Sequence, residues 1–526
     1  MNFGKNGRLG ERMSDWLMEN KKQLILCAVI TFMWGFAAHG YMFMNNNPSH
    51  DALNEFYATT VDVNWKLELG RFLAPFCYFV IRGKLTISWL IGLLSLVYIA
   101  VALFFTTKIF EMKSKLLIAL VGGVMVTNPT LIAEYATYIH DADVNMLALL
   151  FAVLAAYLWK EKDGISGLIY GAVLLALSLG GYQSYMSVTI TFIILVSIID
   201  LLDGTDEKAV FFKGLKGVAM IAAGCVLYFA ICSAIYSVTG LASSGRTNAL
   251  DFSDKTTNVP LYILQLILNA YYYFKEYITE TMADMYYGGL LYALAAMIVI
   301  TGVMVALYVL LKKEFSILKK LLIAMLAVLM PLAMNITYVT SKGSGVHDLM
   351  HYSVWFVHAV LLIMAYWVCD SAKMKAGVYI KAVSCVLVAL LLWGNVRIAN
   401  TAYLKKDIEF NSELSLMTRV TYDMERTEGY VVGETVVMIE NMSNVYSRVP
   451  GTENIEKLIG LSSSSPITMD FRYGEYFKYV LNYPIVEATE EQIAAIKQTQ
   501  AYKDMPDYPA QGYMQIIDGI LVAKMG

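Results

Sequence analysis

Two polar segments of the chain carry carboxylates in positions where they could take a proton from a hydroxyl group. Asp51 directly follows a long apolar stretch, in the sequence Ser49-His50-Asp51, and Asp141 ends a second polar run that begins at Asn128-Pro129. A carboxylate held close to a hydroxyl group can act as the general base of a group transfer. We therefore take Asp51 as the first candidate for a catalytic base and Asp141 as the second.

Cationic and hydrogen-bonding side chains occur in segments of the same kind. Arginine and lysine can stabilise a leaving phosphate, and polar or aromatic side chains can bind a sugar. The candidates for phosphate binding are Arg71, Arg246 and Lys342. The candidates for binding a sugar or an acceptor are His50, Trp65, Asp143, Gln183, Tyr185, His347 and His351. These residue types fit the transfer of a sugar from a phosphate-linked donor.

Two patterns resemble metal ligands but are incomplete. Asp141-Ala-Asp143 has the D-x-D spacing of enzymes that bind a metal and a diphosphate, and two acids at this spacing arise often by chance. His347 and His351 are four residues apart, which would place both on one face of a helix, but the sequence offers no third ligand. We predict no metal site and no cofactor, and leave a requirement for a divalent cation open.

The elements that must position these residues are membrane helices. The 526 residues are 58% hydrophobic and only 16% charged, which is unlike a soluble domain. A transmembrane helix needs about 20 mostly apolar residues. We predict eleven spans, at 23–44, 85–107, 115–133, 143–159, 165–182, 186–202, 215–238, 287–311, 319–340, 351–369 and 376–396.

The distribution of lysine predicts how these spans are oriented. Lys21 and Lys22 precede the first span, and every predicted inner loop contains lysine, so the N-terminus is expected in the cytoplasm. An odd number of spans then places the tail on the outer side. We expect a cytoplasmic segment at 1–22, a transmembrane domain at 23–398 with outer loops at 45–84, 134–142, 239–286 and 341–350, and an extracytoplasmic domain at 399–526.

The tail is predicted to be a small α/β domain. A helix continues from the last span to about Arg426, a strand covers Thr435–Glu440, a helix covers Thr489–Lys497, and Asp518-Gly519 joins the two strands of a hairpin. From Asn400 onward there are 11 lysines and arginines against 18 acids, so nucleic acid is an unsuitable partner. None of the six cysteines lies after Cys385, and an external tail without disulfides suits a bacterial surface better than a eukaryotic secretory lumen. We expect the protein in a bacterial cell membrane.

The order of these motifs resembles the GtrII-type bacterial glucosyltransferases over most of the chain. The resemblance rests on Ser49-His50-Asp51, on Trp65 and Gly70-Arg71, and on Asn128-Pro129 leading to Tyr138 and Asp141. It also rests on the turn from Ser178 to Gln183 and on Met505-Pro-Asp-Tyr-Pro509 before the final hairpin. One departure is that this family often has paired acids after the first helix, whereas here the first of the pair is His50.

The resemblance implies a fold, an activity and partners. The fold would be an all-α polytopic membrane bundle of the GT-C type, with about eleven transmembrane helices and the extracytoplasmic α/β tail. The enzyme would move a sugar, typically glucose, from a polyprenyl-phosphate donor to a surface polysaccharide or wall polymer on the outer face. It would depend on a polyprenyl-phosphate glucosyl synthase and a flippase to supply the donor.

Two other classes of protein remain open from the sequence. A transporter or flippase for a lipid-linked saccharide would also expose polar groups among membrane helices, although it should carry them near the middle of the bilayer. A receptor or assembly protein could bind a wall polymer through the tail without chemistry. The clustering of charges outside the predicted spans favours the transferase.

Overall fold

Eleven helices of the structure are long and apolar enough to cross a membrane, as the sequence predicts. The computed structural model describes residues 9–162, 164–244, 259–340, 346–373, 375–440, 449–458 and 473–525. Within these residues the spans are formed by α1 (Leu9–Met44), α5 (Ser88–Ile109), α6 (Lys115–Thr127) with α7 (Pro129–Thr137), η2 (Ile139–Asp141) with α8 (Ala142–Glu161), α9 (Gly164–Gly181), η3 (Gln183–Tyr185) with α10 (Met186–Leu202), α11 (Glu207–Thr239), α13 (Leu290–Leu311), α14 (Ile317–Met334), α16 (Tyr352–Trp355) with α17 (Val357–Ser371), and α18 (Gly377–Arg426).

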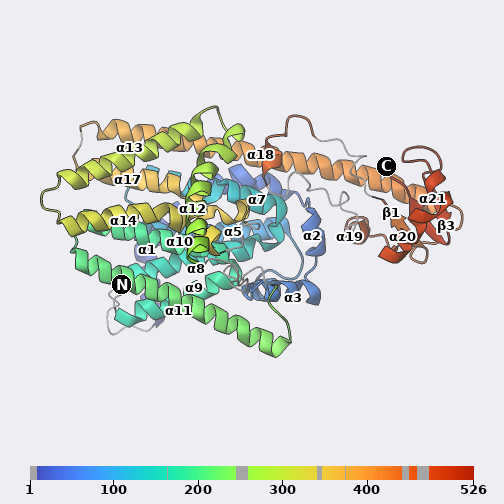
Figure 1. Cartoon of the computed structure of the whole chain (residues 1–526), viewed down its shortest axis with the longest axis horizontal. Coiled ribbons are helices and arrows are strands. Elements are labelled where there is room, and N and C mark those ends of the chain that lie inside the picture. The colour runs from blue at the N-terminus through green and yellow to red at the C-terminus, as the bar shows by residue number, and fades with distance from the viewer. Residues whose placement is uncertain are drawn as a thin grey trace.

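The spans lie roughly side by side around a buried core (Figure 1). Helix α8 is largely buried and packs against α5, α9 and α10. The helices α11, α13 and α14 lie at the periphery and expose large apolar side chains, among them Phe229 and Leu310. Because apolar surface on this scale is costly in water, these faces are suited to contact with lipid.

A break in the third span buries polar residues inside the bundle. Helix α6 ends at Thr127, and the Asn128 side chain accepts a hydrogen bond from the backbone N–H of Leu131 to cap α7, with Pro129 at the first helical position. The loop predicted at 134–142 is instead the end of α7 followed by the short helix η2. Nearly all of its residues are buried, including Asp141. The polar residues of this segment therefore lie in a buried turn between two membrane helices, and not in an exposed outer loop.

The chain between the first two spans folds into four short helices. These are α2 (His50–Asn54), α3 (Thr60–Glu68), α4 (Leu73–Phe76) and the π-helix η1 (Cys77–Ile81). Thr59 and Asp62 form a capping box at the start of α3, which satisfies two backbone donors, the N–H groups of Thr59 and Asp62. We call residues 45–87 the first loop, and the end of the bundle that carries it the tail face, because the C-terminal domain lies at the same end (Figure 1).

A second group of short elements borders the tail face. Helix α12 (Val259–Glu276) continues into η4 (Tyr277–Thr281) and η5 (Ala283–Met285), and α15 (Thr337–Thr340) and η6 (Asp348–Met350) lie before α16. Helix α12 falls within the predicted loop 239–286 and runs across the direction of the spans in Figure 1. Its backbone groups bond to one another, which allows so apolar a segment to lie beside the bundle.

The tail is a small α/β unit built on the extended end of α18, as predicted from its sequence. One four-stranded sheet has the order β2-β1-β4-β3, formed by β1 (Val436–Ile439), β2 (Val486–Glu487), β3 (Met514–Ile517) and β4 (Ile520–Ala523). The last two strands form the predicted hairpin, with Asp518 and Gly519 both at positive φ. The helices of the tail are η7 (Ile455–Lys457), α19 (Tyr473–Tyr479), α20 (Glu490–Gln498) and α21 (Gln500–Asp504).

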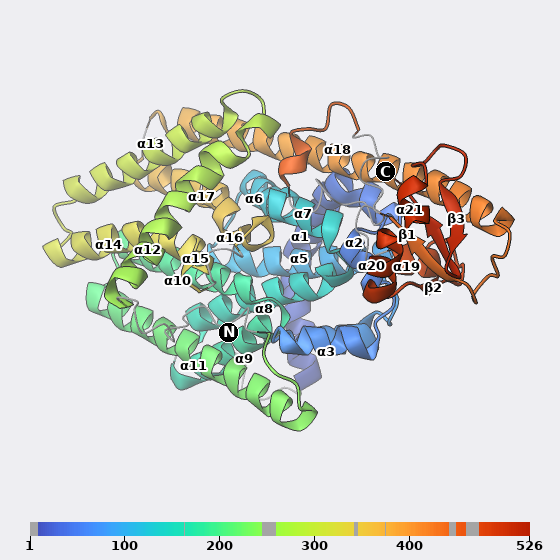
Figure 2. The same ribbon diagram turned by 45° about the vertical axis from the view of Figure 1, so that its right-hand side comes forward.

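The tail domain packs directly onto the first loop. Leu53 of α2 is fully buried in the same apolar cluster as Met417 of α18 and Phe477 of α19. The rings of Phe56 and Tyr479 stack with their centroids 5.3 Å apart. Since Asp51 lies on the same short helix as Leu53, the tail helps to fix the position of the Asp51 carboxylate. Both views show α18 passing from the bundle into the tail (Figures 1 and 2).

Candidate active site

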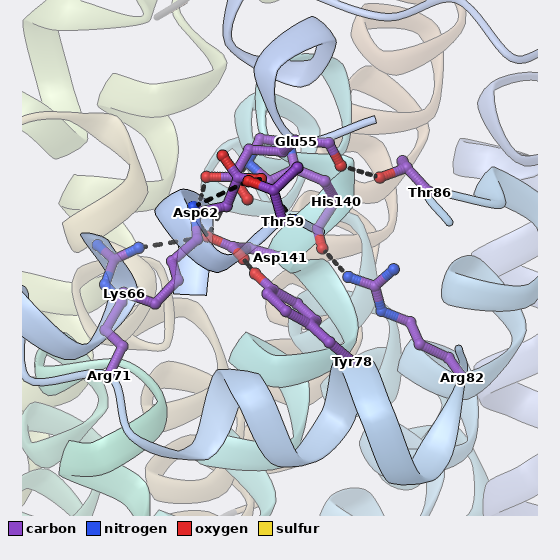
Figure 3. Close-up of polar contacts among 10 residues, drawn as sticks. All are labelled: Glu55, Thr59, Asp62, Lys66, Arg71, Tyr78, Arg82, Thr86, His140 and Asp141. Atoms are coloured by element: carbon purple, nitrogen blue, oxygen red, sulfur yellow. Dashed lines mark hydrogen bonds and ion pairs between the residues drawn. The ribbon is translucent and has the colours of Figure 1, made fainter. Parts of the chain in front are cut away.

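Lys66 connects two carboxylates that are far apart in the sequence. Its Nζ atom lies 2.9 Å from Glu55 Oε1 and 2.8 Å from Asp141 Oδ2 (Figure 3). The lysine side chain is almost completely buried. Burial acts to lower the pKa of Lys66, but the carboxylates of Asp141 and Glu55 outweigh it and raise the pKa above its usual value. Lys66 is therefore a fixed positive charge at the tail face.

Asp141 is surrounded by hydrogen-bond donors. Besides Lys66, Arg71 Nη1 lies 3.4 Å from Asp141 Oδ2, and the Tyr78 hydroxyl donates to Oδ1. Burial raises the pKa of Tyr78 well above its usual value, so the phenol keeps the proton that it donates. His140 Nε2 is 4.0 Å from the same carboxylate. With its lone pairs engaged in this way, Asp141 is better placed to hold two cations than to accept a proton.

The two acids of the D-x-D pattern point to different partners. Asp143 Oδ2 lies 3.1 Å from Arg82 Nε, while Asp141 faces Lys66 and Arg71. Arg82 is held in turn by the backbone oxygens of His140 and Leu85. Among the residues that the structure describes, no group of three or more His, Cys, Asp or Glu side chains could hold a metal ion. The two acids of the pattern therefore form three ion pairs with Lys66, Arg71 and Arg82.

Asp51 is less enclosed than Asp141 and Asp143. It is partly exposed and lies in the first turn of α2, which is anchored by a 2.5 Å hydrogen bond from Ser49 Oγ to the backbone oxygen of Thr137. The side chain of Asp51 is hydrogen-bonded to Tyr138. Burial and the negative charge of Asp51 both raise the pKa of Tyr138, so the phenol keeps its proton and donates it in this hydrogen bond. A partly exposed carboxylate with a fixed donor is positioned to receive a proton from a substrate.

Arg71 combines a firm position with unused hydrogen-bonding capacity. Its guanidinium lies 4.8 Å from the centroid of the Tyr182 ring and touches Asp141 on one edge only. Its Nε atom is buried and has no hydrogen-bond partner among the described residues. Since a guanidinium has five donors and binds phosphate well, Arg71 could hold a phosphate without leaving Asp141.

Gln183 supports Arg71 through the preceding turn. Gly70 has φ +73°, and a Cβ atom there would lie 2.1 Å from the hydroxyl of Tyr228. The side-chain nitrogen of Gln183 donates to the backbone oxygen of Leu69 at 2.8 Å and to the hydroxyl of Tyr228 at 2.9 Å. Both amide protons of Gln183 are used in fixing the turn, so only its oxygen remains for the predicted contact with a sugar.

The remaining predicted residues are distributed more widely. Trp65 is 39% exposed on α3, next to Lys66, whereas Tyr185 is buried between the rings of Tyr182 and Tyr352. His351 is buried against Tyr277, with ring centroids 4.1 Å apart, and burial lowers its pKa to about 3. His347 lies just before η6 in the same region. His351 thus belongs to an aromatic cluster with Tyr277. Arg246, Lys342 and the side chain of His50 lie outside the described residues.

Several residues of the site are not apparent from the sequence. Glu55, Lys66, Tyr78 and Arg82 lie in the first loop, and for Glu55, Tyr78 and Arg82 the sequence gives no reason to select them over its other polar residues. A signal existed for Lys66, which lies between Trp65 and Leu67 in a short amphipathic helix. Apolar residues on both sides of a lysine favour its burial where the loop packs against a membrane bundle. A buried lysine is then expected to pair with an acid.

The fold and the site together define a polytopic membrane protein with a buried, charge-paired centre at one end of its helical bundle. The family model described as Glucosyl transferase GtrII matches residues 40–364, which is more than half of the chain and includes all the charged residues of the site. The chain belongs to this family and is a glycosyltransferase. Neither the curated proteins nor the solved structures include one that matches the chain.

Proposed function

We propose that the protein transfers glucose from a polyprenyl-phosphate donor to a surface polysaccharide or wall polymer, with Asp51 as the general base. The family supplies the glucosyl transfer. The observation that carries the rest is that a partly exposed acid, Asp51, and a cation whose Nε atom has no partner among the described residues, Arg71, both lie in the first loop at one end of a membrane bundle. A lipid-linked sugar phosphate can approach such a site while its hydrocarbon chain stays between the helices and the lipid.

The chemistry assigned to the residues is a single displacement. Asp51 takes the proton of an acceptor hydroxyl, the hydroxyl oxygen bonds to the anomeric carbon, and the bond from that carbon to the phosphate oxygen breaks. The departing phosphate carries the negative charge, which Arg71 stabilises with its free donors. Asp141 has a positioning role, since it holds Arg71 and Lys66 in place. Direct displacement by one base inverts the configuration at the anomeric carbon.

We further propose that the tail face is the outer face of a bacterial cell membrane. Support comes from Lys21 and Lys22 in the first part of α1 and from lysines at the end of the bundle opposite the tail face, such as Lys113, Lys208 and Lys320, which fit the cytoplasmic side. On this orientation the donor must be flipped before it reaches the site. A synthase for the lipid-linked sugar and a flippase are therefore the expected functional partners.

Glu55 should make the activity depend on pH near neutrality. Burial raises the pKa of Glu55 to about 7 even though Lys66 opposes the shift. Below that pH the carboxyl group is protonated and Lys66 loses one of its two anionic partners. We expect the rate of transfer to rise as the pH increases through about 7, and Glu55→Gln to lower the rate and abolish this rise. An unchanged pH profile in Glu55→Gln would show that another group titrates.

The donor class is tested with the purified protein in lipid. Transfer of labelled glucose is measured from polyprenyl-phosphate glucose and, separately, from nucleotide-linked glucose, with envelope polysaccharide as acceptor. We expect product from the lipid donor only. Product from the nucleotide sugar in the absence of any lipid carrier would refute the proposal for the donor and leave the glycosyltransferase assignment intact.

A further inference from the structure

A cleft separates the start of α3 from the tail domain. Its volume is about 650 Å³. One wall comes from the first loop and the other from α19 and the segment that follows it; the polar and aromatic residues that line it include Thr59, Asp62, Glu475, Lys478, Tyr479 and Asn482. Figure 2 shows α3 and the tail domain at the same end of the molecule. The cleft therefore lies where the two units that carry the tail face meet.

The lining has the chemistry of a site for a polyhydroxylated ligand. Asn482 and Lys478 are exposed to solvent, and Asp62, which caps α3 through one carboxylate oxygen, also lines the cleft. Amide, ammonium and carboxylate groups can hydrogen-bond the hydroxyl groups of a sugar. Tyrosine rings beside them can pack against the faces of sugar rings. Glu487 also lines the cleft, so that its described residues carry three acids against one lysine. This charge disfavours an acidic polymer.

One wall of the cleft is formed by the helix that also carries Lys66 of the charged centre. Asp62 and Lys66 are four residues apart on α3, so they share one face of the helix and are separated by about 6 Å along its axis. Lys66 in turn contacts Glu55 and Asp141. A chain lying in the cleft would thus have one of its sugar units beside the first loop, the segment that also carries Asp51.

We propose that this cleft binds the acceptor, and that the acceptor is a glycan that is neutral or carries amino groups. The proposal rests on the function proposed above. It gives the tail domain a defined task, which is to hold the polymer while the first loop presents the base. Binding of this kind affects the affinity for the acceptor and leaves the reaction of the lipid donor unaltered.

The test separates the acceptor from the donor. Envelope polysaccharide from cells that express the protein is divided by anion exchange into a neutral fraction and an acidic fraction, and each is used as acceptor with polyprenyl-phosphate glucose. We expect acceptor activity in the neutral fraction. Glu475→Ala and Lys478→Ala should each raise the KM for this acceptor about tenfold, the effect of losing one or two hydrogen bonds, with the KM for the donor unchanged.

The matched control is Arg419→Ala, in a shallow exposed groove on α18 of the same tail. We expect it to leave both KM values unchanged. The proposal is overturned if neither cleft variant changes the KM for the acceptor, or if all acceptor activity is found in the acidic fraction. If the native protein transfers nothing from the lipid donor to either fraction, the proposed function itself has failed, which is a distinguishable result.

Discussion

Replacing Asp51 by asparagine should reduce the rate of glucosyl transfer by about 10²–10⁴-fold, the usual contribution of a general base. The substitution keeps the size of the side chain and its hydrogen bond with Tyr138, but the amide cannot take a proton from the acceptor. We therefore expect kcat to fall while the KM for the lipid donor stays within a factor of about two. The measurement is the initial rate from polyprenyl-phosphate glucose with the purified variant.

Asp504→Asn is the control for this experiment. Asp504 is an exposed acid at the end of α21 whose side chain accepts a hydrogen bond from Gln500 only among the described residues, so its loss should leave the rate unchanged. Full activity in Asp51→Asn would contradict the assigned role. In that case Glu55, whose pKa of about 7 suits a base, would be the next residue to replace, followed by Asp141.

Replacing Lys66 by methionine should destabilise the folded protein by about 3–5 kcal/mol, the cost of leaving a buried charge without its partner. Lys66 is the cation between Glu55 and Asp141, and all three side chains are almost inaccessible to solvent. Methionine fills similar space without the charge. We expect a lower temperature of thermal unfolding in detergent, together with a loss of transfer, because Asp141 then draws Arg71 away from the position for the donor.

Two further variants distinguish charge from packing at this position. Lys66→Arg keeps the positive charge and should recover much of the stability. Combining Lys66→Met with Glu55→Gln removes one of the unpaired acids and should be more stable than Lys66→Met alone. If Lys66→Met unfolds at the same temperature as the native protein, Lys66 does not balance the charge of buried acids. The pairing on which this account of the site depends is then wrong.

The membrane helices and the final hairpin follow from local rules, which is why they could be predicted. Each span is a long apolar run, and a backbone in lipid must satisfy its own hydrogen bonds, so composition alone indicates a helix. Asp518 and Gly519 both need positive φ, a requirement that few other pairs meet. The buried turn at η2 could not be predicted in this way, because its residues are polar and only their neighbours in space exclude water.

The site could be predicted only in part, for a similar reason. Asp51, Arg71 and Asp141 stand out because they follow spans or turns, and the structure brings Arg71 and Asp141 into contact. Lys66 became part of the site through its pairing with Asp141, which lies 75 residues further along the chain. A pairing over such a distance depends on how the helices pack, and a single sequence contains no direct record of it. The same packing places His351 beside Tyr277, in a separate cluster.

The most direct test of the central claim follows the sugar of the lipid donor in sealed proteoliposomes. The donor carries a label in its glucose, and the same vesicles are assayed for covalent transfer of the label to a polysaccharide acceptor and for movement of the intact donor to the other leaflet. We predict transfer to the acceptor, lost in Asp51→Asn, with no movement of the donor across the bilayer. Movement of the intact donor without transfer would contradict this account and identify a flippase.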